Sequence, residues 1–153
     1  MLKTVKDETV RSILKKAAKK EYELYLLYKN AEKCVKDAHI KTILKRFARE
    51  ELEHEQAIKN FNIDGLKKQK IEINEASQQE ILQYLTGKSL SDYSDLEDML
   101  IFVTKLEKKA FEFYSNLSKC IENPDLKKLF IWLAQEESRH REDIEDLFWD
   151  VAY

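Results

Sequence analysis

Apolar residues recur at heptad-like spacing in four long segments, as the buried stripe of an amphipathic helix requires. The spacing predicts four helices, at residues 7–36, 39–61, 94–122 and 125–149. Ser94 and Glu97 form a capping box at the start of the third helix, and Pro124 stands where the fourth helix should begin. The connections at 37–38 and 123–124 are so short that each pair of helices must form an antiparallel hairpin.

The hairpins, 7–61 and 94–149, are separated by a crossover segment at residues 62–93. Within it, "SQQEILQYLTG" is typical of a short capped helix. A helix of about 25 residues is roughly 38 Å long, and a connection of this length can run from one end of a bundle to the other. The sequence therefore predicts an all-α fold, a four-helix bundle with one long crossover, as a single domain over residues 1–153.

The two hairpins match each other at a constant offset of 86 residues, without a gap from residue 19 to residue 61. Both carry the string Glu-Glu-x-x-His, and a further glutamate stands 30 residues before the second glutamate of each string. The matched pairs are Glu21/Glu107, Tyr28/Tyr114, Cys34/Cys120, Glu50/Glu136, Glu51/Glu137 and His54/His140. Chance similarity between two amphipathic hairpins could align lysines and leucines, but hardly this set. A duplicated hairpin explains it and implies pseudo-two-fold symmetry.

Ionisable residues occupy core positions in all four apolar stripes. Two stripes contain one glutamate each, and the other two contain a Glu-x-x-His pair, whose members share a helix face. These inward residues are Glu21 in the first helix, Glu51 and His54 in the second, Glu107 in the third, and Glu137 and His140 in the fourth.

A buried layer of this kind needs partners, because an unpaired buried charge costs on the order of several kcal/mol. No lysine or arginine lies in the stripes at this level, and protonated carboxyl groups would require large pKa shifts. Two divalent cations would balance four carboxylates, with two neutral imidazoles completing the coordination. The same set of donors is found in dinuclear carboxylate bundles. We therefore predict a dinuclear metal site, with a donor set that suits iron, manganese or zinc.

Two other pairs of residues are candidates for a role beside this site. Tyr28 and Tyr114 each follow the glutamate of their helix by seven residues and lean back towards it. Their hydroxyls could orient the carboxylates, or they could be ordinary core tyrosines. Glu50 and Glu136 compete for the ligand role, but they lie about 100° away from the stripe. We therefore favour the second glutamate of each string as the ligand.

Composition limits the classes of function. Two glycines and one proline are typical of a nearly all-helical chain. With 27 basic and 29 acidic residues, there is no reason to expect a nucleic-acid or membrane partner. The start of the chain lacks the apolar region of a secretory signal, so we expect a cytoplasmic protein. Two cysteines without a C-x-x-C motif argue against a disulfide framework or an iron–thiolate site.

The sequence resembles the rubrerythrin-type diiron domain of the ferritin-like superfamily over essentially its whole length. "KKEYELYLLY…LKRFAREELEH" is similar to the first two helices of that family, and "LEKKAFEFYSNL…KKLFIWLAQEESRH" to the third and fourth. The resemblance implies a pair of iron ions bound by the six inward residues. Glu21 and Glu107 would be terminal or bridging ligands, and the other four would be the two Glu-x-x-His pairs.

The sequence departs from full rubrerythrins in two respects. It contains no rubredoxin-like domain with paired C-x-x-C motifs, so electrons are expected from an external donor. Ala110 stands where these proteins carry a further glutamate, which lets an iron change ligands during the peroxide cycle; the matching position of the first helix is Leu24.

The resemblance implies a redox enzyme whose reduced centre reacts with hydrogen peroxide or dioxygen as its small-molecule substrate. One alternative is a ferroxidase that handles iron, which requires a multimeric cage or delivery into one. Another is a non-catalytic helical interaction module. The sequence does not decide the oligomeric state, and a homodimer is compatible with it.

Overall fold

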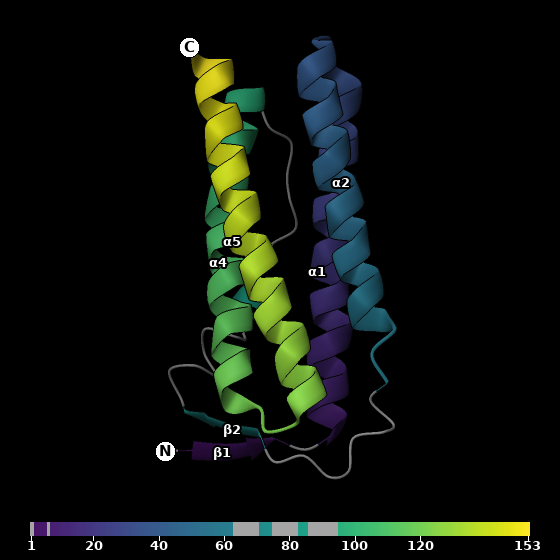
Figure 1. The fold of residues 1–153 in the computed structure, drawn as a ribbon, viewed down its shortest axis with the longest axis vertical. Helices are drawn as coiled ribbons and strands as arrows, with labels where there is room; N and C mark the ends of the chain where they lie inside the picture. The colour runs from purple at the N-terminus through teal and green to yellow at the C-terminus, as the bar shows by residue number, and fades with distance from the viewer. Residues whose placement is uncertain (1, 6, 63–70, 75–82, 86–94) are drawn as a thin grey trace.

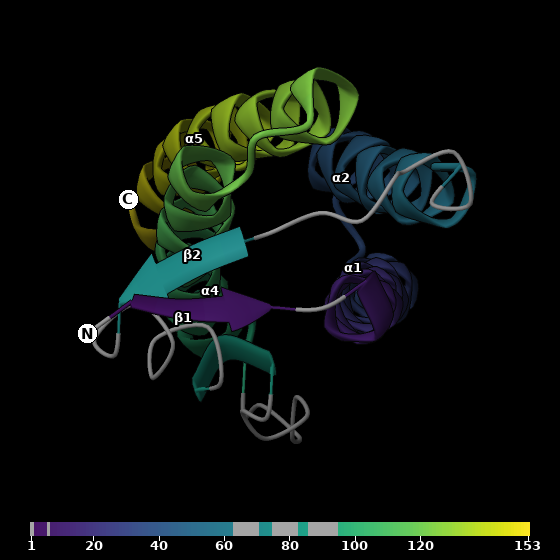
Figure 2. The ribbon, with the colours of Figure 1, turned by 90° about the horizontal axis from the view of Figure 1, so that it is seen from below.

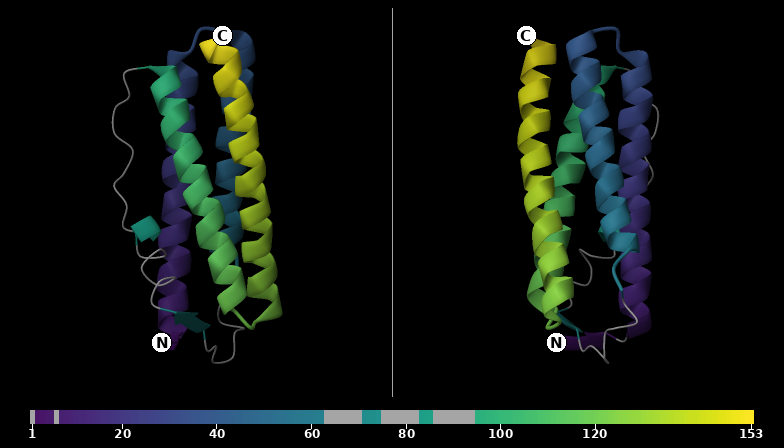
Figure 3. Two further views of the ribbon diagram at one scale, coloured as in Figure 1. Left: turned by 90° about the vertical axis from the view of Figure 1, so that its left-hand side faces the viewer. Right: turned by 45° about the vertical axis from the view of Figure 1, so that its right-hand side comes forward.

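The protein is a bundle of four long helices (Figure 1). The computed structural model describes residues 2–5, 7–62, 71–74, 83–85 and 95–153. Its helices are α1 (Asp7–Cys34), α2 (Ala38–Lys59), α4 (Leu96–Cys120) and α5 (Pro124–Ala152). Helices α1 and α2 form one antiparallel hairpin, α4 and α5 form the other, and the two hairpins lie side by side (Figure 3). The predicted all-α four-helix bundle is thus confirmed. No helix in the described ranges has both the length and the apolar character needed to cross a membrane.

Capping residues set the starts of three helices. The Asp37 carboxylate accepts two backbone N–H groups in the first turn of α2, and the Asn123 side chain does the same for α5, whose first residue is Pro124. Helix α4 has Asp95 as its N-cap. The cap therefore lies one residue after the predicted Ser94, which is itself outside the described residues.

Among the described residues, the core consists of two apolar clusters at different heights of the bundle, and a layer of buried ionisable residues separates them. The lower cluster joins the first half of α1 and the end of α4 to the start of α5; among its members are Leu14, Ala17, Ala110, Leu117, Phe130 and Leu133. The upper cluster includes Leu24, Leu44, Phe47, Leu100, Val103, Ile144 and Leu147. Full burial of one such large side chain contributes about 1.5–3 kcal/mol. These clusters can therefore offset a polar layer between them.

A small antiparallel sheet lies across the lower end of the bundle (Figure 2). It pairs β1 (Leu2–Val5) with β2 (Ile71–Asn74), so that Leu2 lies opposite Asn74 and Val5 opposite Ile71. The sequence does not predict this sheet, because an alternation of polar and apolar residues cannot be recognised in two strands of four residues, and their pairing is long-range. Of the predicted short helix at 77–87, residues 83–85 are helical, and the remainder lies outside the described residues.

Candidate metal centre

The six ionisable residues at core positions meet at one level of the bundle. Each of the four helices contributes to this layer, and each residue is at most 1% exposed. They are Glu21 from α1, Glu51 and His54 from α2, Glu107 from α4, and Glu137 and His140 from α5. The heptad positions direct these side chains inward, and the apolar clusters above and below separate them from water.

Within the layer, donor atoms form two overlapping groups of four, and in each group the four atoms lie within 4.8 Å of one another. The first group is Glu21, Glu51, His54 and Glu137, and the second is Glu51, Glu107, Glu137 and His140. Glu51 and Glu137 belong to both groups, whereas Glu21 and Glu107 belong to one each. The sequence left open which glutamates bridge. The geometry places the glutamate of each Glu-x-x-His pair at the centre and the other two at the ends.

Most of the cluster residues have buried polar atoms without a hydrogen-bond partner. These atoms are Oε2 of Glu21, Glu51 and Glu107, both carboxylate oxygens of Glu137, and Nδ1 of His54. Each buried polar atom left in this state costs about 1–3 kcal/mol, and native structures contain few of them. Cations placed among these atoms would satisfy them, so the residues present fit a pair of metal ions.

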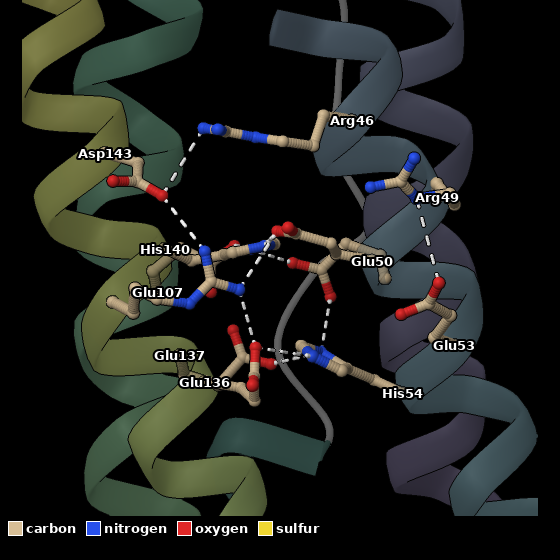
Figure 4. A network of polar contacts seen from close by, with 12 residues as sticks. Arg46, Arg49, Glu50, Glu53, His54, Glu107, Glu136, Glu137, His140 and Asp143 are labelled. Carbon is tan, nitrogen blue, oxygen red and sulfur yellow. Dashed lines mark hydrogen bonds and ion pairs between the residues drawn. The ribbon is translucent and has the colours of Figure 1, made fainter.

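Both histidines turn the Nδ1 atom of the imidazole towards the cluster (Figure 4). Nδ1 of His54 lies 3.0 Å from Oε1 of Glu137, which belongs to the other hairpin. Nδ1 of His140 lies 2.8 Å from Oε1 of Glu51, again across the hairpins. Nδ1 is therefore the nitrogen that each histidine would offer to a metal ion bound in the cluster.

The outer nitrogen of each histidine faces the first glutamate of the opposite Glu-Glu-x-x-His string. Nε2 of His140 contacts the Glu50 carboxylate, and Nε2 of His54 lies 3.7 Å from Oε2 of Glu136. The guanidinium of Arg139 bridges these two glutamates, at 3.2 Å from Glu50 and 2.6 Å from Glu136. A carboxylate on the outer N–H orients a ligating histidine and keeps the inner nitrogen available.

Glu50 and Glu136 thus lie outside both groups of donor atoms, on the far side of the histidines. In the sequence these two glutamates stand only as competing ligands, and their contact with the imidazoles was not predicted. One feature of the sequence did indicate such a contact, because each Glu-Glu-x-x-His string contains two consecutive glutamates and only the second is needed as a ligand.

Both candidate tyrosines reach a glutamate of the opposite hairpin. The Tyr28 hydroxyl donates to Oε1 of Glu107 over 3.1 Å, and the Tyr114 hydroxyl donates to Oε1 of Glu21 over 2.6 Å. Burial raises the pKa of both phenols, and the nearby carboxylates raise it further. The tyrosines therefore remain protonated donors that hold the two end carboxylates in place.

The four cluster glutamates divide into two kinds by pKa. Burial raises the pKa of Glu51 and of Glu137 well above the ordinary value, and the charges of Glu107 and Glu21 raise it further. Burial also acts on Glu21, but contacts with Glu51 and His54 outweigh it and lower the pKa to about 2. The pKa of Glu107 is lowered in the same way, by Glu137 and His140.

Both histidines have a raised pKa. Burial disfavours the charged imidazolium, but the adjacent carboxylates outweigh it, with Glu137 the main one for His54 and Glu51 for His140. In the metal-free layer these shifts favour bound protons on the two central glutamates and on both histidines, and the ionised form of the two end glutamates. The protons make this arrangement electrically neutral, as two divalent cations would after replacing them.

Comparison with protein families shows that a family model described as Rubrerythrin matches residues 12–143. This range contains all six cluster residues and both tyrosines. Comparisons with curated proteins and with solved structures gave no match.

Proposed function

Because the chain belongs to the rubrerythrin family, we propose that its buried cluster binds two iron ions and that the protein is a diiron oxidoreductase. Its substrate would be hydrogen peroxide or dioxygen, and its electrons would come from an external donor. The observation that carries this proposal is the pair of overlapping four-residue groups with unpartnered inward atoms. Manganese or zinc would suit the same donors, and the choice of iron rests on the family.

In this proposal the two central glutamates, Glu51 and Glu137, would contribute to holding both metal ions, because they belong to both groups of donors. One histidine and one end glutamate would complete each position, and the pseudo-two-fold symmetry makes the two positions alike. Four carboxylates would balance two divalent cations, with the imidazoles as neutral ligands through Nδ1. Binding in this form satisfies the buried oxygens that otherwise have no partner.

The surrounding residues orient the ligands and exclude water. Tyr28 and Tyr114 hold the end carboxylates. Glu50 accepts from the outer nitrogen of His140, and the Glu136 carboxylate lies 3.7 Å from that of His54. The apolar clusters keep bulk water away from the layer. Bound as a ferrous pair, iron would supply the two electrons that reduce one molecule of hydrogen peroxide, with two protons, to water.

Neither side of the site offers an additional carboxylate one turn after the end glutamate. Ala110, three residues after Glu107, is fully buried, and Leu24, three residues after Glu21, is 4% exposed. In our proposal each metal position therefore keeps the same ligands in its reduced and oxidised states. This fixed coordination also favours the alternative of a ferroxidase, which oxidises ferrous ions and passes them on.

The decisive experiment is anaerobic loading with ferrous iron, followed by stopped-flow oxidation with hydrogen peroxide or with dioxygen. We expect about two ions per chain and faster oxidation by peroxide. Faster oxidation by dioxygen, together with iron accumulating beyond two ions per chain, would favour the ferroxidase. A Glu51→Gln variant should lose both reactions. Glu53→Gln is the matched control, because Glu53 is exposed on the same helix.

A further inference from the structure

The pseudo-two-fold symmetry of the site is broken beside the histidines. The indole of Trp132, on α5, packs edge-to-face on the imidazole of His54, with ring centroids 5.4 Å apart and an interplanar angle of 84°. The position 86 residues earlier, on α2, is Arg46. Its guanidinium lies over the Phe47 ring and pairs with Asp143 at 3.4 Å. The position that carries an aromatic ring against a candidate ligand in one hairpin therefore carries an ion-paired arginine in the other.

Trp132 connects the interior of the site to solvent by a single side chain. It is 38% exposed, whereas His54, which it contacts, is 1% exposed. Edge-to-face contact at this centroid distance is close packing between aromatic rings. An electron on a donor at the surface would thus cross one conjugated ring to reach a candidate metal ligand.

The other aromatic contacts of the cluster in the described residues offer no such direct route. The His140 ring packs on Phe47, which is fully buried. At one end of the cluster, Glu21 accepts a hydrogen bond from Tyr114, and the Tyr114 ring contacts the Tyr84 ring with 6.5 Å between the ring centroids. That route has two steps, and Tyr84 is only 9% exposed.

We propose that Trp132 is the point at which electrons from an external one-electron donor enter the site, passing through His54 to the nearer metal ion. This inference rests on the proposed diiron function and adds the place on the protein surface at which the donor delivers its electrons. Two donor molecules each lose one electron, and two ferric ions become ferrous. The indole bridges the transfer and ends unchanged, so no bond in the protein forms or breaks.

Reduction kinetics test this role. Oxidised, iron-loaded protein is mixed anaerobically with titanium(III) citrate, a bulky anionic one-electron donor, and the loss of ferric absorbance is followed. Trp132→Leu should reduce at least tenfold more slowly per bound iron pair, and Trp132→Phe should be intermediate because it retains an aromatic ring. Trp149→Leu is the matched control. Trp149 is 58% exposed on the same helix, and its ring contacts are with Phe148 and Tyr153.

Oxidation of the same variants by peroxide separates electron transfer from structural damage. Peroxide oxidation of the reduced protein should stay within twofold of wild type in Trp132→Leu, because that step needs no donor. Equal reduction rates in wild type and Trp132→Leu would overturn the inference, as would equal slowing of reduction and oxidation. A chain that binds no iron pair would instead refute the proposed function, and iron content is measured first for that reason.

Tryptophan fluorescence supplies a readout that needs no redox chemistry. The chain has two tryptophans, so Trp149→Phe leaves only Trp132 and Trp132→Phe leaves only Trp149. Titration with cobalt(II), a quenching ion, should remove more than half of the emission of Trp132 and little of that of Trp149. Stoichiometric cobalt binding without preferential quenching of Trp132 would contradict the contact with His54 on which the inference depends.

Discussion

Tyr114 donates a 2.6 Å hydrogen bond to Glu21, a residue of the opposite hairpin. Tyr28 makes the equivalent bond to Glu107 in the other direction. The two hairpins are thus linked through the carboxylates at the ends of the candidate metal site. The position of each end carboxylate therefore depends on how the hairpins pack together.

Removal of the Tyr114 hydroxyl should weaken metal binding without unfolding the bundle. In Tyr114→Phe, Oε1 of Glu21 loses its donor, and loss of a group that orients a ligand typically reduces metal affinity by about 10–100-fold. Competition with a chromophoric chelator measures the affinity, and circular dichroism checks the helix content. Tyr22→Phe is the control, because Tyr22 is exposed on α1, the helix that carries Glu21. Equal affinities in the two variants would show that the bond to Glu21 has no part in metal binding.

Central and end glutamates should differ in how much metal their loss removes. Glu51 belongs to both groups of donors and Glu21 to one. Glu51→Ala should therefore lose nearly all bound metal, whereas Glu21→Ala should retain about one ion per chain. Elemental analysis after anaerobic loading and gel filtration gives the content. Helix content should remain near wild type in both, since the apolar clusters drive folding. The same loss in both variants would contradict the assignment of Glu51 as a bridge.

Removal of metal should lower the melting temperature. A ligand that binds only the native state stabilises it by about 2.7 kcal/mol at a concentration 100 times its dissociation constant. For a chain of this size, that corresponds to a shift of roughly 5–10 °C. Calorimetry with and without a chelator measures it, and Glu51→Ala should not respond to the chelator. An unchanged melting temperature in the wild type would argue against a buried metal site.

Metal binding should release protons and strengthen as the pH rises. Glu51, Glu137, His54 and His140 have raised pKa values in the metal-free protein, and each must lose a proton to act as a ligand. At neutral pH we therefore expect up to about four protons to be released per chain on loading with two ions. A pH indicator in weakly buffered solution, titrated with zinc, measures the number. No release of protons would mean that the cluster is already deprotonated before metal arrives.

The same pKa shifts predict that the metal-free protein loses stability as the pH rises. A group whose pKa is raised by folding binds its proton more tightly in the native state. The stability contributed by Glu51 and Glu137 is fully present below the ordinary glutamate pKa of 4.5, and that of the histidines below 6.5. Each contribution declines as the pH rises above that ordinary value, and it is lost once the pH passes the folded-state pKa. Denaturant unfolding of chelated protein between pH 5 and 9 should show this decline, and metal-loaded protein should not.

Sequence alone determined the bundle and the inward direction of six ionisable residues. Heptad spacing specifies which way a side chain points from its own helix axis. The side chain of a glutamate or histidine on an apolar stripe therefore points into the interior of the bundle. The 86-residue repeat then required the two hairpins to contribute the same residue types at the same level. Neither inference needs the position of a neighbouring helix.

Tertiary structure decided which residues meet. The central place of Glu51 and Glu137, the crossed bonds of Tyr28 and Tyr114, and the pairing of β1 with β2 all join segments far apart in the chain. So does the contact of Trp132 with His54. Periodicity specifies the direction in which a side chain points from its own helix. The rotation and separation of the packed helices decide which residues of the neighbouring helices that side chain contacts. Those quantities arise from packing both hairpins at once, and no pattern within a single segment contains them.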